Sequence, residues 1–303
     1  MNYELWELDL IIFHHSLFII HYSFYKMPTK FIKHFYKITG TTWLFLLDLI
    51  FPIECLGCGR EGDPPAGEAG WLCGRCFKKL NLKNRQYCLH CKKANDFGQF
   101  CPPCRVLYGL DGVWIAALYD DKLINLAIKK LKYHFISSLA GALGELLIIF
   151  TDNLINQAGV LKAGLREGVS WQDLDRAKNA PLAILDFKAD LVIPVPLSAK
   201  RLRWRGFNQA ETLARIFSRA YGLEINTRDL IRIKHRTAQA KLNEIKRLEN
   251  IKNCFVWRGG NLNKRNIILI DDVVTTGATL NECAKVLKAN GAGEVFGLVA
   301  AKG

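Results

Sequence analysis

The sequence contains no uninterrupted run of 18 apolar residues, although half of its 303 residues are apolar. A helix that crosses a bilayer needs about 20 predominantly apolar residues. The sequence therefore predicts no transmembrane span, and it has enough apolar residues for a folded core. The first 26 residues also lack the basic start of a secretory signal. Methionine occurs only at Met1 and Met27, and we expect the natural chain to begin at Met27.

Acidic residues are scarce relative to basic ones. The chain carries 28 Asp and Glu against 42 Lys and Arg, which gives a formal charge of +14 at pH 7 and an isoelectric point near 9.3. Much of the excess lies between Pro196 and Arg265, where seventeen basic residues stand against five acidic ones. This balance indicates a polyanionic partner: nucleic acid, an anionic surface or a phosphorylated ligand. We expect a cytoplasmic protein, and the apolar helix predicted within residues 28–50 makes attachment to the inner face of the membrane the alternative.

Cysteine, by contrast, is plentiful, and eight of the ten cysteines form four Cys-x-x-Cys pairs. Two such pairs complete a tetrahedral zinc site, so we predict two small zinc ribbons with ligands for one or two structural Zn²⁺ ions. A thioredoxin-type motif would need a βαβ setting, and a secreted disulfide framework would not normally repeat the pair four times. Spacing alone leaves open whether neighbouring or alternate pairs share a metal. The predicted ligands are Cys55, Cys58, Cys73, Cys76, Cys88, Cys91, Cys101 and Cys104.

Residues 266–280 predict a strand, a turn and a helix suited to a phosphate. The apolar run 267–270 is typical of a parallel strand buried on both faces, and Asp271 and Asp272 follow where such a strand ends. Open α/β sheets bind ligands at this edge. A hydroxyl-rich turn then opens a predicted helix that ends at Gly291, and the N-terminus of a helix offers free N–H groups to a phosphate. The turn consists of Thr275, Thr276, Gly277, Ala278 and Thr279.

A second loop with the same potential follows the short strand predicted at residues 191–193. Its cations crowd a predicted turn before a helix that should run from about Gly206 to Gly222. A basic turn that enters a helix N-terminus suits an anion such as a diphosphate. The candidate ligand residues in this loop and at the start of the helix are Lys200, Arg201, Arg203, Arg205 and Asn208.

The remaining segments predict supporting elements and one arm. Residues 111–119 alternate as in a strand, and residues 121–150 predict two helices, the first with a basic face that includes Lys132. Residues 151–190 are predicted to form mainly a long connection. A basic arm that contains Arg236 then leads to a predicted strand near Phe255. We expect this arm to be mobile, either as a lid over a diphosphate or as a contact for single-stranded nucleic acid.

Several motifs occur in one order along the chain: FPxxCLxCG at residues 51–59, the paired CxxC ribbons, LKY at 131–133, PVPL at 194–197, RGFNQAETLA at 205–214, RTAQAKL at 236–242 and DDVVTTGAT at 271–279. In this order they resemble the ComF family, which is also called the amidophosphoribosyltransferase-like family of competence proteins. The resemblance implies an α/β protein with a type I phosphoribosyltransferase fold, a central and mainly parallel sheet flanked by helices, behind a double zinc ribbon. The expected domains are an N-terminal extension with an apolar helix at 1–50, the ribbon at 51–107 and the phosphoribosyltransferase-like domain at 108–303.

The resemblance also implies a role for each candidate residue. Residues 275–279 would hold the 5-phosphate of phosphoribosyl pyrophosphate, and Asp271 and Asp272 would bind the ribose hydroxyls, with Mg²⁺ bridging the ribose and the diphosphate. The loop at 200–208 and Arg236 would bind the diphosphate. Purine-salvage members of the wider superfamily carry an Asp that acts on the base where this chain has Thr275. Purine salvage is therefore disfavoured, and the acceptor stays unassigned.

Three functions follow from the resemblance and from the basic charge. The first is a phosphoribosyltransferase, in the glycosyltransferase class, that acts in DNA uptake during natural transformation. The second is a non-catalytic component that binds single-stranded DNA beside the competence helicase machinery, and the third is a sensor that binds a ribose phosphate without turnover. Few aromatic residues interleave the basic region beyond Trp204, Phe207 and Trp257, so the sequence gives little support for base stacking.

Overall fold

The computed structural model describes residues 54–60, 71–83, 85–95, 97–133, 139–164, 183–184, 187–234 and 251–303. These residues all belong to one compact unit that runs from Glu54 to Gly303. The apolar helix predicted within residues 28–50 lies outside the described residues, and so does Arg236. The expected boundary between a ribbon and a sheet domain after residue 107 stays a prediction.

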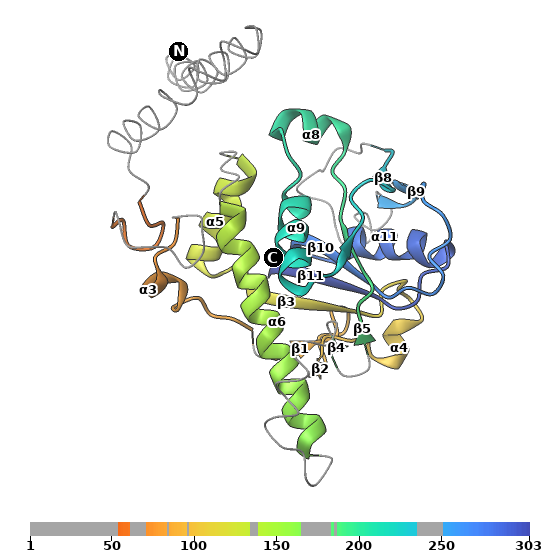
Figure 1. The fold of residues 1–303 in the computed structure, drawn as a ribbon, viewed down its shortest axis with the longest axis horizontal. Coiled ribbons are helices and arrows are strands. Elements are labelled where there is room, and N and C mark those ends of the chain that lie inside the picture. The colour runs from red at the N-terminus through yellow and green to blue at the C-terminus, as the bar shows by residue number, and fades with distance from the viewer. Residues whose placement is uncertain are drawn as a thin grey trace, which may run out of the picture. The chain divides into compact units, whose positions relative to one another are not determined.

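A five-stranded sheet forms the centre of the described fold (Figure 1). The strand order is β3-β11-β10-β6-β7, and every neighbouring pair is parallel. Together with the cysteine-rich region, this sheet confirms the predicted α/β class with a zinc ribbon. Because β10 is the middle strand, the acid pair that it carries lies at the centre of the sheet. The strands are β3 (Gly112–Leu118), β6 (Leu191–Pro194), β7 (Glu224–Ile225), β10 (Ile267–Val274) and β11 (Val295–Lys302).

β10 is buried on both faces, as its apolar run predicts. Ile268 and Ile270 belong to the hydrophobic cluster on one face of the sheet, whereas Ile267 and Leu269 belong to the cluster on the other. This alternation follows from the two-residue period of strand side chains. The strand continues to Val274, so the prediction that it ends at the acid pair is wrong. Backbone pairing with β11 extends past the two acids and fixes where they lie.

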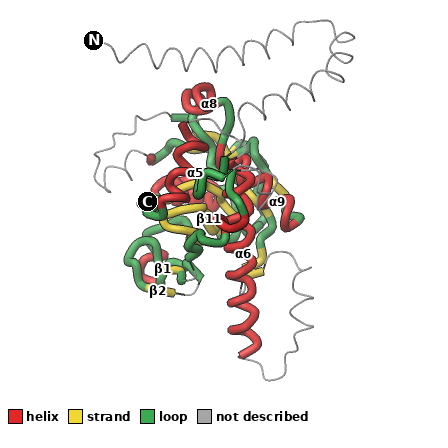
Figure 2. Tube along the Cα trace, turned by 90° about the vertical axis from the view of Figure 1, so that its left-hand side faces the viewer, coloured by secondary structure: helices red, strands yellow, loops and turns green. Residues whose placement is uncertain are grey.

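Helices cover both faces of the sheet (Figures 1 and 2). Three of them contribute to the first cluster, where α6 packs along α9. The fourth, α11, contributes its apolar face to the second cluster. The positions of all four agree with the helical spacing of apolar residues in the sequence. Their bounds are α5 (Lys122–Tyr133), α6 (Leu139–Gly164), α9 (Gln209–Tyr221) and α11 (Ala278–Ala289).

α6 is longer than the sequence predicts. Residues 151–164, which were expected to begin a long connection, continue the helix to Gly164. The window Leu139–Ala158 is long and apolar enough to cross a membrane by length and composition, but 56% of it is buried inside the fold, as in a core helix. Gly144 explains how closely α6 approaches α9, since a Cβ atom there would lie 2.7 Å from Cγ2 of Ile216.

Short elements complete the described fold. β8 (Leu230–Arg232) pairs antiparallel with β9 (Phe255–Trp257), which confirms the strand predicted near Phe255. Most of the basic arm, residues 235–250, lies between them and outside the described residues. The other short elements are helices α3 (Gly74–Phe77) and α4 (Pro102–Arg105) and the strand pairs β1 (Gln86–Tyr87) with β2 (Ala94–Asn95) and β4 (Ala183–Ile184) with β5 (Phe187–Lys188).

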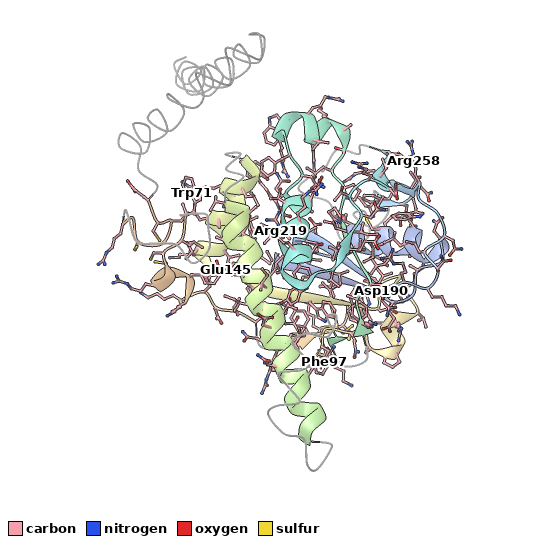
Figure 3. All side chains as sticks on the ribbon, viewed as in Figure 1. Trp71, Phe97, Glu145, Asp190, Arg219 and Arg258 are labelled. Carbon is pink, nitrogen blue, oxygen red and sulfur yellow. The ribbon has the colours of Figure 1, made fainter. Side chains whose placement is uncertain are left out.

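The cysteine-rich region covers the β3 edge of the sheet. The buried side chain of Gln86 hydrogen-bonds both the N–H and the C=O of Ile115, at 3.0 and 3.2 Å. The carbonyl of Phe97, which is labelled in Figure 3, accepts a hydrogen bond from Nε1 of Trp114 at 2.9 Å. The bonds from Gln86 satisfy backbone groups that a bare edge strand would leave unpaired. Backbone bridges add to them, between Leu82 and Ala117 and between Gln99 and Gly112.

Candidate functional site

The acid pair lies in the C-terminal half of β10, just beyond the last residue that pairs with β6, and α5 supplies a cation there. Oδ1 of Asp271 accepts a hydrogen bond from the backbone N–H of Asp272 at 2.8 Å. Oδ1 of Asp272 lies 2.9 Å from Nζ of Lys132, and the two side chains are only 9% and 19% exposed. Burial, and then the charge of Asp272, raise the pKa of Asp271 to about 7 although Lys132 opposes the shift. Asp271, and Asp272 with Lys132 beside it, offer carboxylate oxygens of the kind that a divalent cation takes as ligands.

Replacing Asp271 with asparagine is expected to stabilise the ligand-free protein more and more as the pH rises from about 5 to about 7. The folded chain holds the Asp271 proton with a pKa of about 7 instead of 3.8. This contribution to stability is therefore complete below about pH 4 and is lost as the pH rises through about 7. The advantage of the variant should grow by about 1.4 kcal/mol per pH unit within this window.

Urea denaturation of both proteins at three pH values measures this effect. Asp120→Asn is the matched control, because Asp120 is an exposed acid that follows β3 at the same edge of the sheet. The control should follow the wild type at each pH. Parallel stability curves for Asp271→Asn and the wild type would contradict the raised pKa.

Residues 275–277 form a turn and residues 278–279 begin α11, and the backbone of this segment suits an anion. Gly277 adopts a positive φ of 77°, and α11 begins at Ala278 without a hydrogen bond from a capping side chain. The first N–H groups of a helix have no partner within the helix. They lie at the positive end of the helix dipole, so they are available to bind an anion. A contact inside the turn, from the N–H of Ala278 to Oγ1 of Thr276, is long at 3.4 Å. Thr275 is exposed, so its hydroxyl can also reach a ligand.

The second cysteine-rich ribbon contacts this turn. A Cβ atom added to Gly277 would lie 2.6 Å from Cδ2 of Leu89. Leu89 directly follows Cys88 and is only 6% exposed. A second contact links the same ribbon to the end of β11, because Nζ of Lys302 lies 4.8 Å from the ring centroid of Tyr87. The shape of the turn therefore depends on the ribbon as well as on the sheet.

The basic segment before α9 is a helix, and the predicted turn is wrong. This helix, α8 (Ala199–Arg205), starts after Ser198, whose Oγ accepts a hydrogen bond from the N–H of Arg201 at 3.4 Å. It ends at Gly206, which has a φ of 76°. Lysine and arginine are good helix formers, so a Ser cap and a Gly stop are enough to fold a segment whose charge density indicated a turn.

α8 separates the four predicted cations into two pairs. Arg201 and Arg205 are partly buried, whereas Lys200 and Arg203 are exposed. Burial lowers the pKa of Arg205, and Asp272 is the charged neighbour with the largest effect on it. The charge of the acid pair therefore acts on Arg205, and Arg201 acts on the same guanidinium from within α8. Among the described contacts, none joins Lys200 or Arg203 to the acid pair.

Three buried polar atoms near the start of α9 have no hydrogen-bond partner among the described residues. They are Nε of Arg205, Oδ1 of Asn208 and Nε2 of Gln209. Their side chains are held in place, since Nδ2 of Asn208 donates to the carbonyl of Val195 at 3.1 Å and Nη1 of Arg205 donates to Oε1 of Gln209 at 3.0 Å. Buried polar groups are almost always hydrogen-bonded, so these atoms suit a polar ligand.

Arg232 joins the site although no motif singled it out. It ends β8, and its guanidinium carbon lies 5.4 Å from the ring centroid of Phe255 in β9. Burial lowers its pKa, the charge of Arg201 lowers it further, and Cys254, Cys283 and, least of all, Asp271 raise it. The signal that could have found it is its position, at the last residue of a strand that leads into the basic arm.

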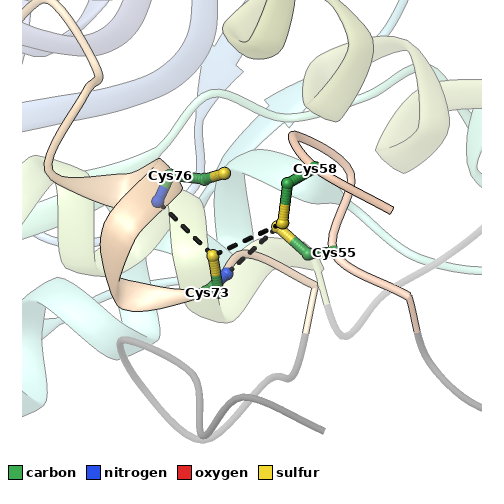
Figure 4. A group of neighbouring side chains, drawn as sticks. All are labelled: Cys55, Cys58, Cys73 and Cys76. Carbon is green, nitrogen blue, oxygen red and sulfur yellow. Dashed lines mark hydrogen bonds between the residues drawn. The ribbon is translucent and has the colours of Figure 1, made fainter. Parts of the chain in front are cut away.

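The first four cysteines converge on one point (Figure 4). The Sγ atoms of Cys55, Cys58, Cys73 and Cys76 lie within 4.8 Å of one another. Burial opposes ionisation of Cys55, but backbone N–H groups, first that of Cys73, outweigh it and lower its pKa to about 6. The N–H of Cys73 lies 3.3 Å from Sγ of Cys55. Four thiol groups at these distances suit a structural Zn²⁺ ion.

The other four cysteines form a second cluster of the same kind. The Sγ atoms of Cys88, Cys91, Cys101 and Cys104 also lie within 4.8 Å of one another, and those of Cys91 and Cys101 are 3.5 Å apart. Neighbouring pairs therefore share a metal site, which answers the question that spacing left open. With two complete sets of ligands, the chain can hold two structural Zn²⁺ ions.

Comparison with known proteins agrees with this arrangement. A family model described as a double zinc ribbon domain matches residues 46–105. Competence protein F of Haemophilus influenzae is 29% identical over 255 residues, which cover 81% of this chain and 95% of that protein. The DNA utilization protein YhgH of Escherichia coli K12 is 35% identical over 240 residues, which cover 74% of this chain and 93% of that protein.

Competence protein ComFC of Streptococcus pneumoniae is 37% identical over 115 residues, which cover 37% of this chain and 49% of that protein. The matches to competence protein F and to YhgH cover most of this chain and most of those proteins. At this identity over most of both chains, they show that the chain belongs to the ComF family.

Proposed function

We propose that the protein binds phosphoribosyl pyrophosphate with Mg²⁺ at the C-terminal edge of its sheet and acts in DNA uptake during natural transformation. One juxtaposition supports the proposal: Asp272 pairs with Lys132, the acid pair is followed by the uncapped start of α11, and its charge acts on Arg205 of α8. This set offers oxygens to a divalent cation, N–H groups to a phosphate and guanidinium groups to a diphosphate. The names of the relatives, competence proteins and DNA utilization proteins, support the biological role.

The proposed reaction is a substitution at the ribose carbon that carries the diphosphate. Asp271 and Asp272 orient the ribose through its hydroxyls, and residues 275–279 hold the 5-phosphate. Arg201 and Arg205 stabilise the negative charge that grows on the departing diphosphate. A bound Mg²⁺ would add electrostatic stabilisation of the same leaving group. The chain would thus be a phosphoribosyltransferase, and Thr275 supplies no acid or base that would identify the acceptor.

Asp272→Asn tests this function. We expect it to weaken binding of phosphoribosyl pyrophosphate with Mg²⁺ by about 10- to 100-fold, because the largely buried Lys132 loses its charged partner. Diphosphate release should fall in parallel. Isothermal titration measures the binding, and a coupled assay measures the diphosphate. Asp120→Asn, at the same edge of the sheet, is the control and should bind as the wild type does. Unchanged affinity in Asp272→Asn would overturn the proposal. If the wild type binds phosphoribosyl pyrophosphate but releases no diphosphate, the protein is a sensor.

A second candidate function is non-catalytic binding of single-stranded DNA within the uptake machinery, beside its helicase. The observation that favours it is the exposure of Lys200 and Arg203 on α8. Cations on an open helix surface suit the phosphates of a strand, and such binding weakens steeply with salt. We infer a cytoplasmic site of action for both functions, and the two are compatible in one protein.

A further inference from the structure

Two aromatic rings that are distant in the sequence meet beside the acid pair. Tyr133 is the last residue of α5, and Trp204 lies in α8, which approaches that end of α5 (Figures 1 and 2). Their ring centroids are 6.3 Å apart, and the ring planes are tilted by 59°. Tyr133 is 56% exposed and Trp204 is 57% exposed. The structure thus supplies the clustered aromatic residues that the sequence did not indicate.

A guanidinium group stands against both rings. The Cζ atom of Arg205 lies 5.8 Å from the ring centroid of Tyr133 and 5.8 Å from that of Trp204. The hydrogen bond from Nη1 of Arg205 to Gln209 holds it there, and its buried Nε has no partner among the described residues. Aromatic faces beside a fixed cation suit a ligand that is both planar and joined to phosphate.

Tyr133 is the neighbour in sequence of the lysine that pairs with Asp272. Lys132 directly precedes Tyr133, and its Nζ lies 2.9 Å from Oδ1 of Asp272. In a nucleotide the base is bonded to the ribose carbon next to the hydroxyls that the acids would hold. Lys132 and Arg205 thus connect the two rings with the acid pair, so a base on Tyr133 or Trp204 would lie in the neighbourhood of a ribose phosphate held there.

We propose that Tyr133, Trp204 and Arg205 form a binding site for a nucleobase, which stacks on an exposed ring face while Arg205 meets its phosphate or its polar edge. The rings contact each other at a distance typical of aromatic pairs, so a base would stack on the outer face of one ring and would not insert between the two. The site rests on the proposed function, because it is the neighbour of the ribose-phosphate site. The base belongs either to a single strand of nucleic acid or to a free acceptor.

The test compares strands with and without bases. The probes are a labelled thymidine 12-mer and a 12-mer of the same charge whose residues are abasic, measured by fluorescence anisotropy. Tyr133→Ala and Trp204→Ala should each reduce the ratio of the two affinities by about tenfold, the effect of losing one base stack. Tyr133→Phe and Trp204→Phe should keep most of the ratio. Both side chains are more than half exposed, so the variants are expected to fold.

Val106→Ala is the matched control for loss of exposed apolar surface. Val106 is 82% exposed and follows Arg105 in the cysteine-rich region. Arg105 pairs with Asp111, which directly precedes β3. Val106 therefore lies near the N-terminal end of β3, away from the acid pair. A titration with free adenine and free cytosine distinguishes the two sources of the base. If only the free bases lose affinity in the alanine variants, the site serves an acceptor; if only the strand does, it serves a nucleic acid.

Unchanged ratios and unchanged free-base affinities in both alanine variants would overturn the inference. Titrating the wild type with phosphoribosyl pyrophosphate and Mg²⁺ tests the proposed function separately. A wild type that does not bind this ligand defeats the proposed function. A wild type that binds it, with alanine variants that bind strands and bases normally, defeats the nucleobase site alone.

Discussion

Replacing Cys76 with serine is expected to remove one zinc equivalent and a large part of the folding free energy. Cys76 is only 8% exposed, and its Sγ is one of four that lie within 4.8 Å of one another. Serine would leave three thiolates around an incomplete site. Structural zinc contributes about 10–16 kcal/mol in small zinc modules, which is comparable to the whole stability of a domain, about 5–15 kcal/mol. Zinc content per chain and the urea midpoint measure the two losses.

Cys283→Ser controls for the exchange of sulfur for oxygen at a buried position. Cys283 is fully buried in α11 but belongs to neither of the two groups of four cysteines. Its variant should lose some stability, because a hydroxyl is harder to bury than a thiol, and it should keep the zinc content of the wild type. If Cys76→Ser kept the zinc content of the wild type and had the same urea midpoint as Cys283→Ser, the first cysteine cluster would not be a structural zinc site.

Gly277→Ala is expected to cost about 2–5 kcal/mol of stability and to weaken phosphoribosyl pyrophosphate binding at least about tenfold. Part of the cost is backbone strain, since a φ of 77° disfavours any residue with a Cβ by about 1–2 kcal/mol. The rest is overpacking of about 1–3 kcal/mol, because the new Cβ would lie 2.6 Å from Cδ2 of Leu89. Binding falls because the same turn presents the first N–H groups of α11. Urea denaturation and calorimetry measure the two effects.

Gly222→Ala separates strain from overpacking. Gly222 has a φ of 62° after α9, and a Cβ there would meet nothing within 4 Å, so its variant pays only for strain. Adding Leu89→Ala to Gly277→Ala should recover part of the loss, and the double-mutant cycle gives the coupling energy. A Gly277→Ala variant no less stable than Gly222→Ala would show that the ribbon does not support the turn.

The elements with a strong local pattern were predictable from the sequence. The apolar run at 267–270 predicted the buried strand β10, and the turn that follows it predicted the start of α11. In α9, apolar residues at helical spacing and the stop at Gly222 predicted both the helix and its end. Such patterns are sufficient because neighbouring residues alone determine the period and the cap. The cysteine spacing predicted zinc sites for the same reason.

The features that were missed depend on contacts between distant residues or on competing local signals. Arg232 has no motif of its own, and its relation to the site depends on the folded position of β8, where the charge of Arg201 acts on it. α8 was missed because four cations suggested a loop, although Ser198 and Gly206 delimit a helix. The pairing of Tyr133 with Trp204 also requires the folded chain, since 71 positions separate them. The sequence thus identified individual residues of the candidate site better than the contacts between them.

The two cysteine clusters lie in different hydrophobic clusters of the protein. Cys55, Cys73 and Cys76 pack into the one that contains α5, α6 and α9, while Cys88 and Cys104 pack into the one that contains α11. A gene fragment that encoded the sheet alone would leave apolar side chains bare on both faces and one strand edge uncovered. A recombination event that replaced the ribbon alone would therefore have to preserve both of these packing surfaces.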